Sequence, residues 1–289
     1  MTQQALSPID KPYYSKWQAL YCAFYDKRLY IDVLKRWKGF GLIYVLLMCF
    51  VFCIPVAIKT CLQFNAFFND VLVDPISKIP MMAIQKGQVF IGKPQPYIIK
   101  NKMGETSIVI DTAKDMSDLK SSYPNAMMLV TKSVLYFKPV TPTFFDVDAS
   151  KLASSQSVEQ VLTDNENYIF DGPAFLDSLG MKKLRWYSLS IIYPMLGVVV
   201  FSVYLVLYLV LGLMAQFIAA LFFKTKLTYK QSVRLLSVAG TPQAFIFAQF
   251  LALHFLPPGL GVLIILLLAL YFCFAVIVIK REANQLVHH

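Results

Sequence analysis

The chain has 289 residues, of which 57% are hydrophobic and only 15% are charged. Soluble globular domains carry about 25% charged residues, so this composition argues against a water-soluble protein and favours one that lies in a membrane. The formal net charge of +10 comes from 27 Lys and Arg against 17 Asp and Glu. In a membrane protein such an excess marks the cytoplasmic segments, so we expect no nucleic-acid partner.

The first 39 residues are polar, aromatic and basic, and we expect no cleavable signal peptide. Segment 13–38 mixes aromatic residues such as Trp17 and Tyr21 with lysines and arginines. Aromatic rings favour the headgroup zone of a bilayer, and cations favour anionic inner-leaflet lipid. Residues 1–39 are therefore predicted to form a cytoplasmic, amphipathic segment that lies on the lipid bilayer.

Four uncharged stretches are long enough to cross a hydrocarbon core of roughly 30 Å as helices. Within the second, residues 187–223 would form one helix about 55 Å long, with a kink at Pro194. Pro257 and Pro258 predict a tight turn between the third and fourth spans. The predicted transmembrane helices are 40–58, 186–223, 235–255 and 259–279.

The positions of Lys and Arg predict the orientation, because segments that stay in the cytoplasm retain positive charge. Residues 1–39 carry seven basic residues against three acids, and the 224–234 loop carries four basic residues and no acid. The tail 280–289 begins with two more basic residues, Lys280 and Arg281. Both termini are therefore expected in the cytoplasm, with residues 59–185 on the outer side of the membrane.

Residues 59–185 are expected to form a β-rich α+β domain between the first and second spans. Short apolar runs that alternate with polar turns are typical of strands. Hairpin turns are predicted at 85–87 and 131–133, with a longer loop around Gly104. The predicted strands are 81–84, 88–91, 97–99, 107–110, 127–130 and 134–137.

The last third of this domain has a helical character. Residues 150–162 have helical spacing, and Asp171 followed by Pro173 predicts a helix start. That helix is expected to continue into the second span, with Gly180 as its weakest position.

Small residues recur at helical spacing in two of the predicted spans, which lets another helix approach closely. Such packing can occur within one chain or in a homo- or hetero-oligomer. The helix-packing residues are Gly240, Ala244, Ala248 and Ala252 in the third span and Gly212, Ala215 and Ala219 in the second.

The third span also contains polar residues. Gln243 and His254 are eleven residues apart, about three helical turns, so they are expected on nearly the same face. One interpretation is a polar groove, and the other is an ordinary interhelical hydrogen bond from Gln243. The sequence from Gly240 to Pro242 predicts a break in this helix.

The sequence contains no motif that would predict catalytic residues, a cofactor site or a metal site. The span interiors contain no Asp, Glu, Lys or Arg, which disfavours an ion-coupled pump, and no CxxC pair accompanies the five cysteines. Residues 59–185 contain no histidine, so a Ser-His-Asp triad cannot be built there. Several acids invite a calcium hypothesis, but no DxDxDG loop with a following Glu is present, and solvated carboxylates are expected. These acids are Asp111, Asp115, Asp118, Asp146 and Asp148; His288 and His289 are assigned no role.

Three stretches carry a resemblance to a known family: YYSKWQALYCAFYDKRLYIDVLKRWKGFGLIYVLL, KIPMMAIQKGQVFIGKPQPYIIK followed by SIVIDT, and LTYKQSVRLLSVAGTPQAFI. Together they resemble an uncharacterised bacterial membrane-protein family, a domain of unknown function, whose helical part is distantly similar to Yip-type membrane proteins. The resemblance implies a cytoplasmic-membrane protein with a β-rich extracytoplasmic insertion after the first helix. It brings no catalytic residues.

The leading hypothesis is a non-enzymatic integral membrane protein, an accessory component of the bacterial envelope that binds a partner or ligand through its extracytoplasmic domain. The alternative is a transport or lipid-handling protein, suggested by the long second span and the break in the third. A membrane enzyme is disfavoured, because no nucleophile, base or metal constellation is visible. The expected partners are the lipid bilayer and a membrane or envelope protein or a second copy of the chain.

Overall fold

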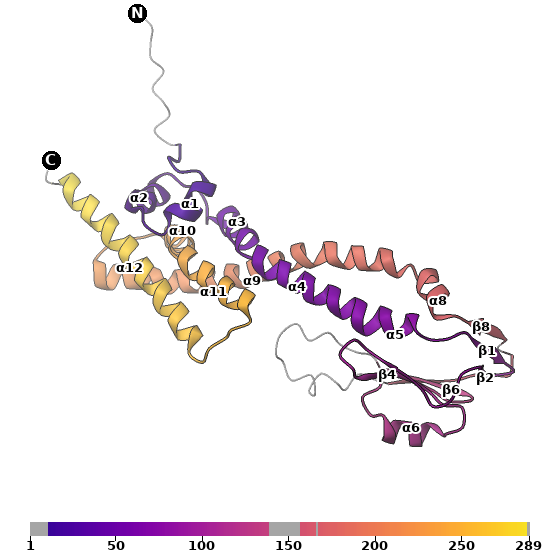
Figure 1. Cartoon of the computed structure of the whole chain (residues 1–289). Helices are drawn as coiled ribbons and strands as arrows, with labels where there is room; N and C mark the ends of the chain where they lie inside the picture. The colour runs from indigo at the N-terminus through magenta and orange to yellow at the C-terminus, as the bar shows by residue number, and fades with distance from the viewer. Residues whose placement is uncertain (1–10, 139–156, 166, 288–289) are drawn as a thin grey trace, which may run out of the picture. The chain divides into compact units, whose positions relative to one another are not determined.

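The computed structural model describes residues 11–138, 157–165 and 167–287, which fall into two units with separate buried cores (Figure 1). The helical unit comprises Met1–Lys59 and Ile192–His289, and the sheet unit comprises Thr60–Ile191. Each unit is described by itself.

The helical unit begins with two short helices, α1 (Lys16–Cys22) and α2 (Lys27–Lys35). Ser15 and Gln18 form a capping box that starts α1. The apolar face of α2 packs against α10 and α12, and Tyr30 is completely buried. α2 thus belongs to the helical core, and the expectation that residues 1–39 lie on lipid stays a prediction. The aromatic residues that remain exposed are Tyr13, Trp17, Tyr21, Phe24 and Tyr25.

The first predicted span, 40–58, is bent and its helix is much longer than expected. The chain bends by 45° at Cys53, between α3 (Leu42–Phe52) and α4 (Ile54–Phe67). Pro55 explains the bend, because its ring lacks an N–H and disfavours helical backbone in the residue before it. The helix then continues through the π-helical η1 (Phe68–Val73) and α5 (Asp74–Ser77), where β structure or loop was expected.

Two helices surround Gly180. Asp171 accepts a hydrogen bond from the backbone N–H of Ala174 and caps α8 (Gly172–Ser178), as predicted. Gly180 has φ +62° and separates α8 from α9 (Met181–Phe223), so the predicted continuous helix is broken at its weakest position. Residues 187–223 lie in a single helix that contains Pro194, as expected.

The C-terminal part of the helical unit contains α10 (Tyr229–Ala239), α11 (Thr241–Leu253) and α12 (Leu260–Val287). The chain bends by 46° between α10 and α11, which confirms the break predicted at Gly240. The 224–234 segment was expected to be a loop, but Thr228 caps α10 and the last six residues of that segment are helical.

Two helices in the described part of the chain are long and apolar enough to cross a membrane: Met181–Phe223 and Leu260–Asn284. Two bent pairs qualify when each pair is counted as one span, Leu42–Phe52 with Ile54–Ser77 and Tyr229–Ala239 with Thr241–Leu253. The structure is thus mostly helical, with two to four candidate membrane-spanning helices.

The described residues of the sheet unit form two sheets. The three-stranded sheet has the order β2-β1-β8, and the five-stranded sheet has the order β3-β4-β5-β6-β7. All six strands expected from the sequence are present. The strands are β1 (Met82–Gln85), β2 (Gln88–Ile91), β3 (Tyr97–Lys100), β4 (Thr106–Ile110), β5 (Met128–Val130), β6 (Val134–Phe137), β7 (Val158–Val161) and β8 (Tyr168–Phe170).

The predicted turns are confirmed. Gln85 pairs with Gln88, and Lys86 and Gly87 between them both have positive φ, as the twist of a two-residue hairpin requires. The longer loop is held by Asn101, whose Oδ1 accepts hydrogen bonds from the backbone N–H groups of Met103 and Glu105.

Two features of the sheet unit differ from the sequence expectations. The helix α6 (Met116–Ser122) joins β4 to β5, which run parallel, and buries Leu119 against them. A parallel pair needs such a crossover. Residues Val158–Val161, expected in a helix, instead pair with β6, while 150–156 lie outside the described residues.

Candidate functional site

The sheet unit contains an apolar cleft of about 770 Å³. Its walls come from segments far apart in the sequence: α5, β1, β6, β8, α8 and the first residue of α9. This volume lies within the range of roughly 300–1,000 Å³ that is usual for small-molecule sites. Prominent lining residues are Ile76, Met82, Leu135, Phe170, Phe175 and Leu179.

A close contact between α5 and α8 shapes this cleft. A Cβ at Gly172 would lie 2.1 Å from the carbonyl oxygen of Ile76, so only glycine allows the two helices to approach this closely. One turn further along α8, Phe175 packs its ring 5.2 Å from that of Phe170, measured between centroids. The cleft wall is thus built by the junction of β8 with α8.

Most side chains that line the cleft are apolar. Its polar side chains come from Gln160, Tyr168, Asp171 and Ser178, and it contains no lysine, arginine or histidine among the described residues. The carboxylate of Asp171 already caps α8, and the hydroxyl of Ser178 donates to the backbone carbonyl of Phe175. Such a lining is suited to an apolar group and offers little to activate a bond.

Exposed strand edges lie beside the cleft. β8 is at the edge of its sheet, and Ile169, which also lines the cleft, is 69% exposed. β7 is at the edge of the other sheet, with Val158 and Val161 exposed. Among the described strands these two are outermost, and an edge strand with apolar side chains can accept another extended segment.

Of the acids considered for calcium, Asp111, Asp115 and Asp118 lie in the described ranges. Asp111 is buried, and its Oδ1 accepts a hydrogen bond from the backbone N–H of Ala113. Asp115 is the residue before α6, and Asp118 lies in its first turn. No group of three or more His, Cys, Asp or Glu residues in the described ranges could hold a metal ion. Asp146, Asp148, His288 and His289 lie outside these ranges.

The small residues of the helical unit include two points of very close approach within the chain. A Cβ at Gly212 on α9 would lie 2.4 Å from Cγ2 of Val233 on α10. A Cβ at Gly240 would lie 2.3 Å from the hydroxyl oxygen of Tyr208 on α9. Of the other small residues, Ala215, Ala219, Ala244 and Ala248 are buried and Ala252 is half-buried.

Gln243 and His254 lie at opposite ends of α11. Gln243 is in the first turn, buried, and its Nε2 donates to the hydroxyl of Tyr204 over 3.4 Å. His254 caps the last turn in a left-handed conformation, with φ 52°. At 1.5 Å per residue they are separated by about 16 Å along the helix, so the structure does not bring them together in one site.

A buried polar cluster lies where α10 meets α11. The hydroxyls of Tyr44 and Thr241 are 2.6 Å apart and both residues are completely buried. The hydroxyl of Tyr208 on α9 and Oε1 of Gln243 on α11 are also buried, without a hydrogen-bond partner in the described part of the chain. Buried polar atoms of this kind mark sites for water or a polar ligand.

Arg234 is a residue whose role the sequence did not reveal. It was counted among the loop charges, but it lies in α10 and is 5% exposed. Its Nη2 donates to the carbonyl oxygen of Leu34 over 2.8 Å, and its Nη1 donates to the carbonyl oxygen of Trp37. The guanidinium thus satisfies one carbonyl group in the last turn of α2 and another just beyond its end. The capping box of Thr228 and Gln231 was the signal that could have placed it in a helix.

Comparison with known proteins gives one match. A family described as "Protein of unknown function (DUF1189)" matches residues 17–277. No curated protein and no solved structure matches the chain. The family match confirms the expectation of an uncharacterised family.

Proposed function

The chain belongs to the DUF1189 family, and from that premise we propose that it is a non-enzymatic integral membrane protein whose sheet unit binds an apolar ligand. The observation that carries the proposal is the apolar cleft between β8, α8 and α5. Its size and lining are those of a binding site for an apolar group, such as an acyl chain. The exposed edges of β7 and β8 add a surface on which a partner segment could pair.

The proposal includes an orientation. All four candidate spans cross the bacterial inner membrane, both termini lie in the cytoplasm, and the sheet unit lies outside. The distribution of basic residues supports this arrangement, because residues 1–39 and 224–234 are strongly basic while 59–185 has almost balanced charge. The distant similarity to Yip-type proteins belongs to the same proposal.

Photocrosslinking tests the ligand site. The full chain in detergent is incubated with a diazirine-bearing, alkyne-tagged palmitate, and crosslinked residues are mapped by mass spectrometry. Crosslinks are expected on residues 168–181 and should fall several-fold in Leu179→Glu, because this half-exposed lining residue would place a charge in the cleft.

Met103→Glu is the matched control, because Met103 is exposed in the same unit and does not line the cleft. It should leave the crosslinks unchanged. Crosslinks confined to the helical unit, or an equal yield from Leu179→Glu and the wild type, would contradict the proposal.

Transport or lipid handling is the second candidate, and the polar cluster at the α10–α11 bend favours it. Broken helices with buried polar groups are typical of transport sites at membrane depth. Liposomes containing the full chain and a fluorescent phospholipid would report lipid movement across the bilayer through accessibility to dithionite. Movement that is lost in Gln243→Leu and kept in Gln249→Leu would support this function, whereas a rate equal to that of empty liposomes would remove it.

A further inference from the structure

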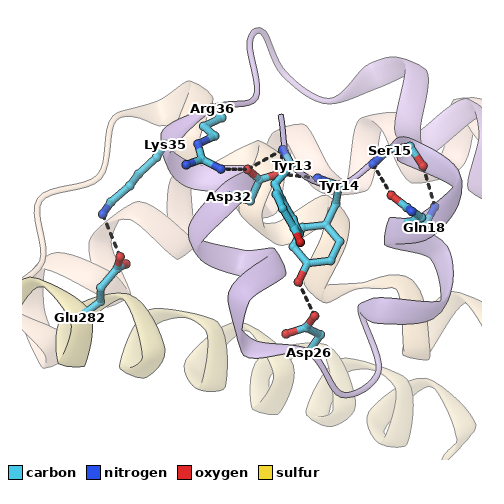
Figure 2. Close-up of polar contacts among 9 residues, drawn as sticks. All are labelled: Tyr13, Tyr14, Ser15, Gln18, Asp26, Asp32, Lys35, Arg36 and Glu282. Atoms are coloured by element: carbon cyan, nitrogen blue, oxygen red, sulfur yellow. Dashed lines mark hydrogen bonds and ion pairs between the residues drawn. The ribbon is translucent and has the colours of Figure 1, made fainter. Parts of the chain in front are cut away.

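A second cleft, of about 930 Å³, lies in the helical unit between α2, α12 and the chain entering α1. Figure 2 shows the polar contacts that frame it. The cleft is independent of the apolar cleft in the sheet unit, and its lining combines cations with an apolar wall.

Asp32 holds the frame of this cleft together. Its carboxylate is almost completely buried and accepts hydrogen bonds from the backbone N–H groups of Tyr13 and Tyr14 at 3.0 and 3.2 Å (Figure 2). It also accepts from Nη1 of Arg36 at 3.3 Å. The negative charge of Asp32 is therefore balanced by hydrogen-bond donors within the protein.

The second acid of the cleft is also paired. Nζ of Lys35 on α2 lies 3.0 Å from Oε1 of Glu282 on α12, so this ion pair ties the two helices together (Figure 2).

The tyrosine that lines the cleft beside Asp32 stays neutral. The hydroxyl of Tyr14 donates to Asp26, and this hydrogen bond raises the pKa of Tyr14 to about 12. Tyr14 thus adds no negative charge to the cleft near neutral pH.

Unpaired positive charge remains. The lining contains five cations and two acids. Within the described ranges, Lys27, Arg28 and Arg281 are exposed and make no ion pair. Guanidinium groups present several N–H donors in a planar fork that fits phosphate oxygens. The free charge of the cleft is therefore suited to a phosphate group.

The other wall of the cleft is apolar and belongs to a candidate span. Phe274, Ile277 and Val278 line it from α12, and Ile277 lies one helical turn before Arg281. The candidate span Leu260–Asn284 contains all four of these residues near its C-terminal end. A cation beside an apolar surface at the end of a span is where a lipid headgroup and its acyl chain meet.

We propose that this cleft binds the phosphate headgroup of an anionic phospholipid, with Arg28 and Arg281 at the phosphate and the acyl chain along Ile277. Free phosphate shares the charge chemistry, but the apolar wall would then have no role. The site is separate from the one under the proposed function and does not depend on it.

Native mass spectrometry of the full chain in detergent tests this site. Dioleoyl phosphatidylglycerol and the zwitterionic dioleoyl phosphatidylcholine are titrated against the wild type and Arg28→Gln/Arg281→Gln. The double variant should weaken phosphatidylglycerol binding about tenfold, because charge-assisted hydrogen bonds are lost, and weaken phosphatidylcholine binding less, because its choline cation already offsets the phosphate charge. Both arginines are exposed, so the thermal unfolding midpoint should stay at the wild-type value.

Lys224→Gln/Lys226→Gln is the matched control, because it removes the same charge from exposed positions outside the cleft. Equal weakening in both double variants would overturn the site, since non-specific attraction would then explain the binding. Inorganic phosphate is titrated as the third ligand. Phosphate binding that depends on Arg28 and Arg281, together with unchanged phosphatidylglycerol binding, would overturn the lipid assignment.

Discussion

The hydroxyl of Tyr208 occupies the space that a side chain at Gly240 would need. A Cβ built on Gly240 would lie 2.3 Å from that oxygen and 2.9 Å from Cζ of the same ring. Gly240 has φ −80°, an ordinary backbone angle, so the constraint on this residue comes from packing. The bend between α10 and α11 therefore lies directly against α9.

Replacing Gly240 with alanine should destabilise the helical unit. The extra methyl group overlaps a completely buried tyrosine, and overpacking of this kind costs about 1–3 kcal/mol. The midpoint of thermal unfolding in detergent should fall. Gly261→Ala is the control, because nothing lies within 4 Å of its added Cβ and alanine favours a helix. Equal midpoints for the two variants would contradict the close contact.

Ala248→Leu should also lower the thermal stability. Ala248 is buried in α11, and three additional carbon atoms there would push the neighbouring helix away. Phe247→Leu, at a half-buried position next to it, should have a much smaller effect. If both variants unfold at the same temperature in detergent, the small residues of α11 do not pack against another helix.

Arg234→Met should destabilise the junction between α2 and α10. The substitution removes the donors that satisfy the carbonyls of Leu34 and Trp37, and each carbonyl left unsatisfied costs about 1–3 kcal/mol. Chemical denaturation of the purified chain would measure the loss. Lys226→Met, which removes the same charge from an exposed position, should leave the free energy of unfolding nearly unchanged. A similar loss in both would show that net charge matters more than these hydrogen bonds.

The proposed orientation can be tested by cysteine labelling. Lys100→Cys should react with an impermeant thiol reagent in intact spheroplasts, and Lys226→Cys should react only after the membrane is opened. Cys61 is half-buried, so the background must lack it. The reverse pattern of labelling would invert the topology.

The strands of the sheet unit could be predicted because their information is local. Each is a short apolar run that is bounded by polar residues, and Lys86-Gly87 has the positive φ angles that a two-residue hairpin needs. The helical structure of residues 60–77 is not visible in the hydropathy pattern, because Lys59 ends the uncharged stretch. An uncharged stretch shows where a chain can lie in lipid, whereas the hydrogen bonds of a helix continue past a single lysine.

The candidate sites could not be predicted, because they are assembled from distant segments. The apolar cleft brings Leu72 together with Met181, and the cationic cleft brings Tyr13 together with Glu282. The basic composition of 224–234 is typical of a cytoplasmic loop, yet tertiary packing buries Arg234. Only tertiary packing decides which charges are paired, buried or free.

Gly172 lies against the carbonyl of Ile76, so the segment that contains all the described strands starts and ends at nearly the same place. The chain leaves α5 and returns at the start of α8, within van der Waals distance of its departure point. Closing such a gap costs little entropy for a few residues of linker. A short glycine-rich bridge could therefore replace residues 78–170 and leave α5 and α8 joined, with Asp171 still in place to cap α8.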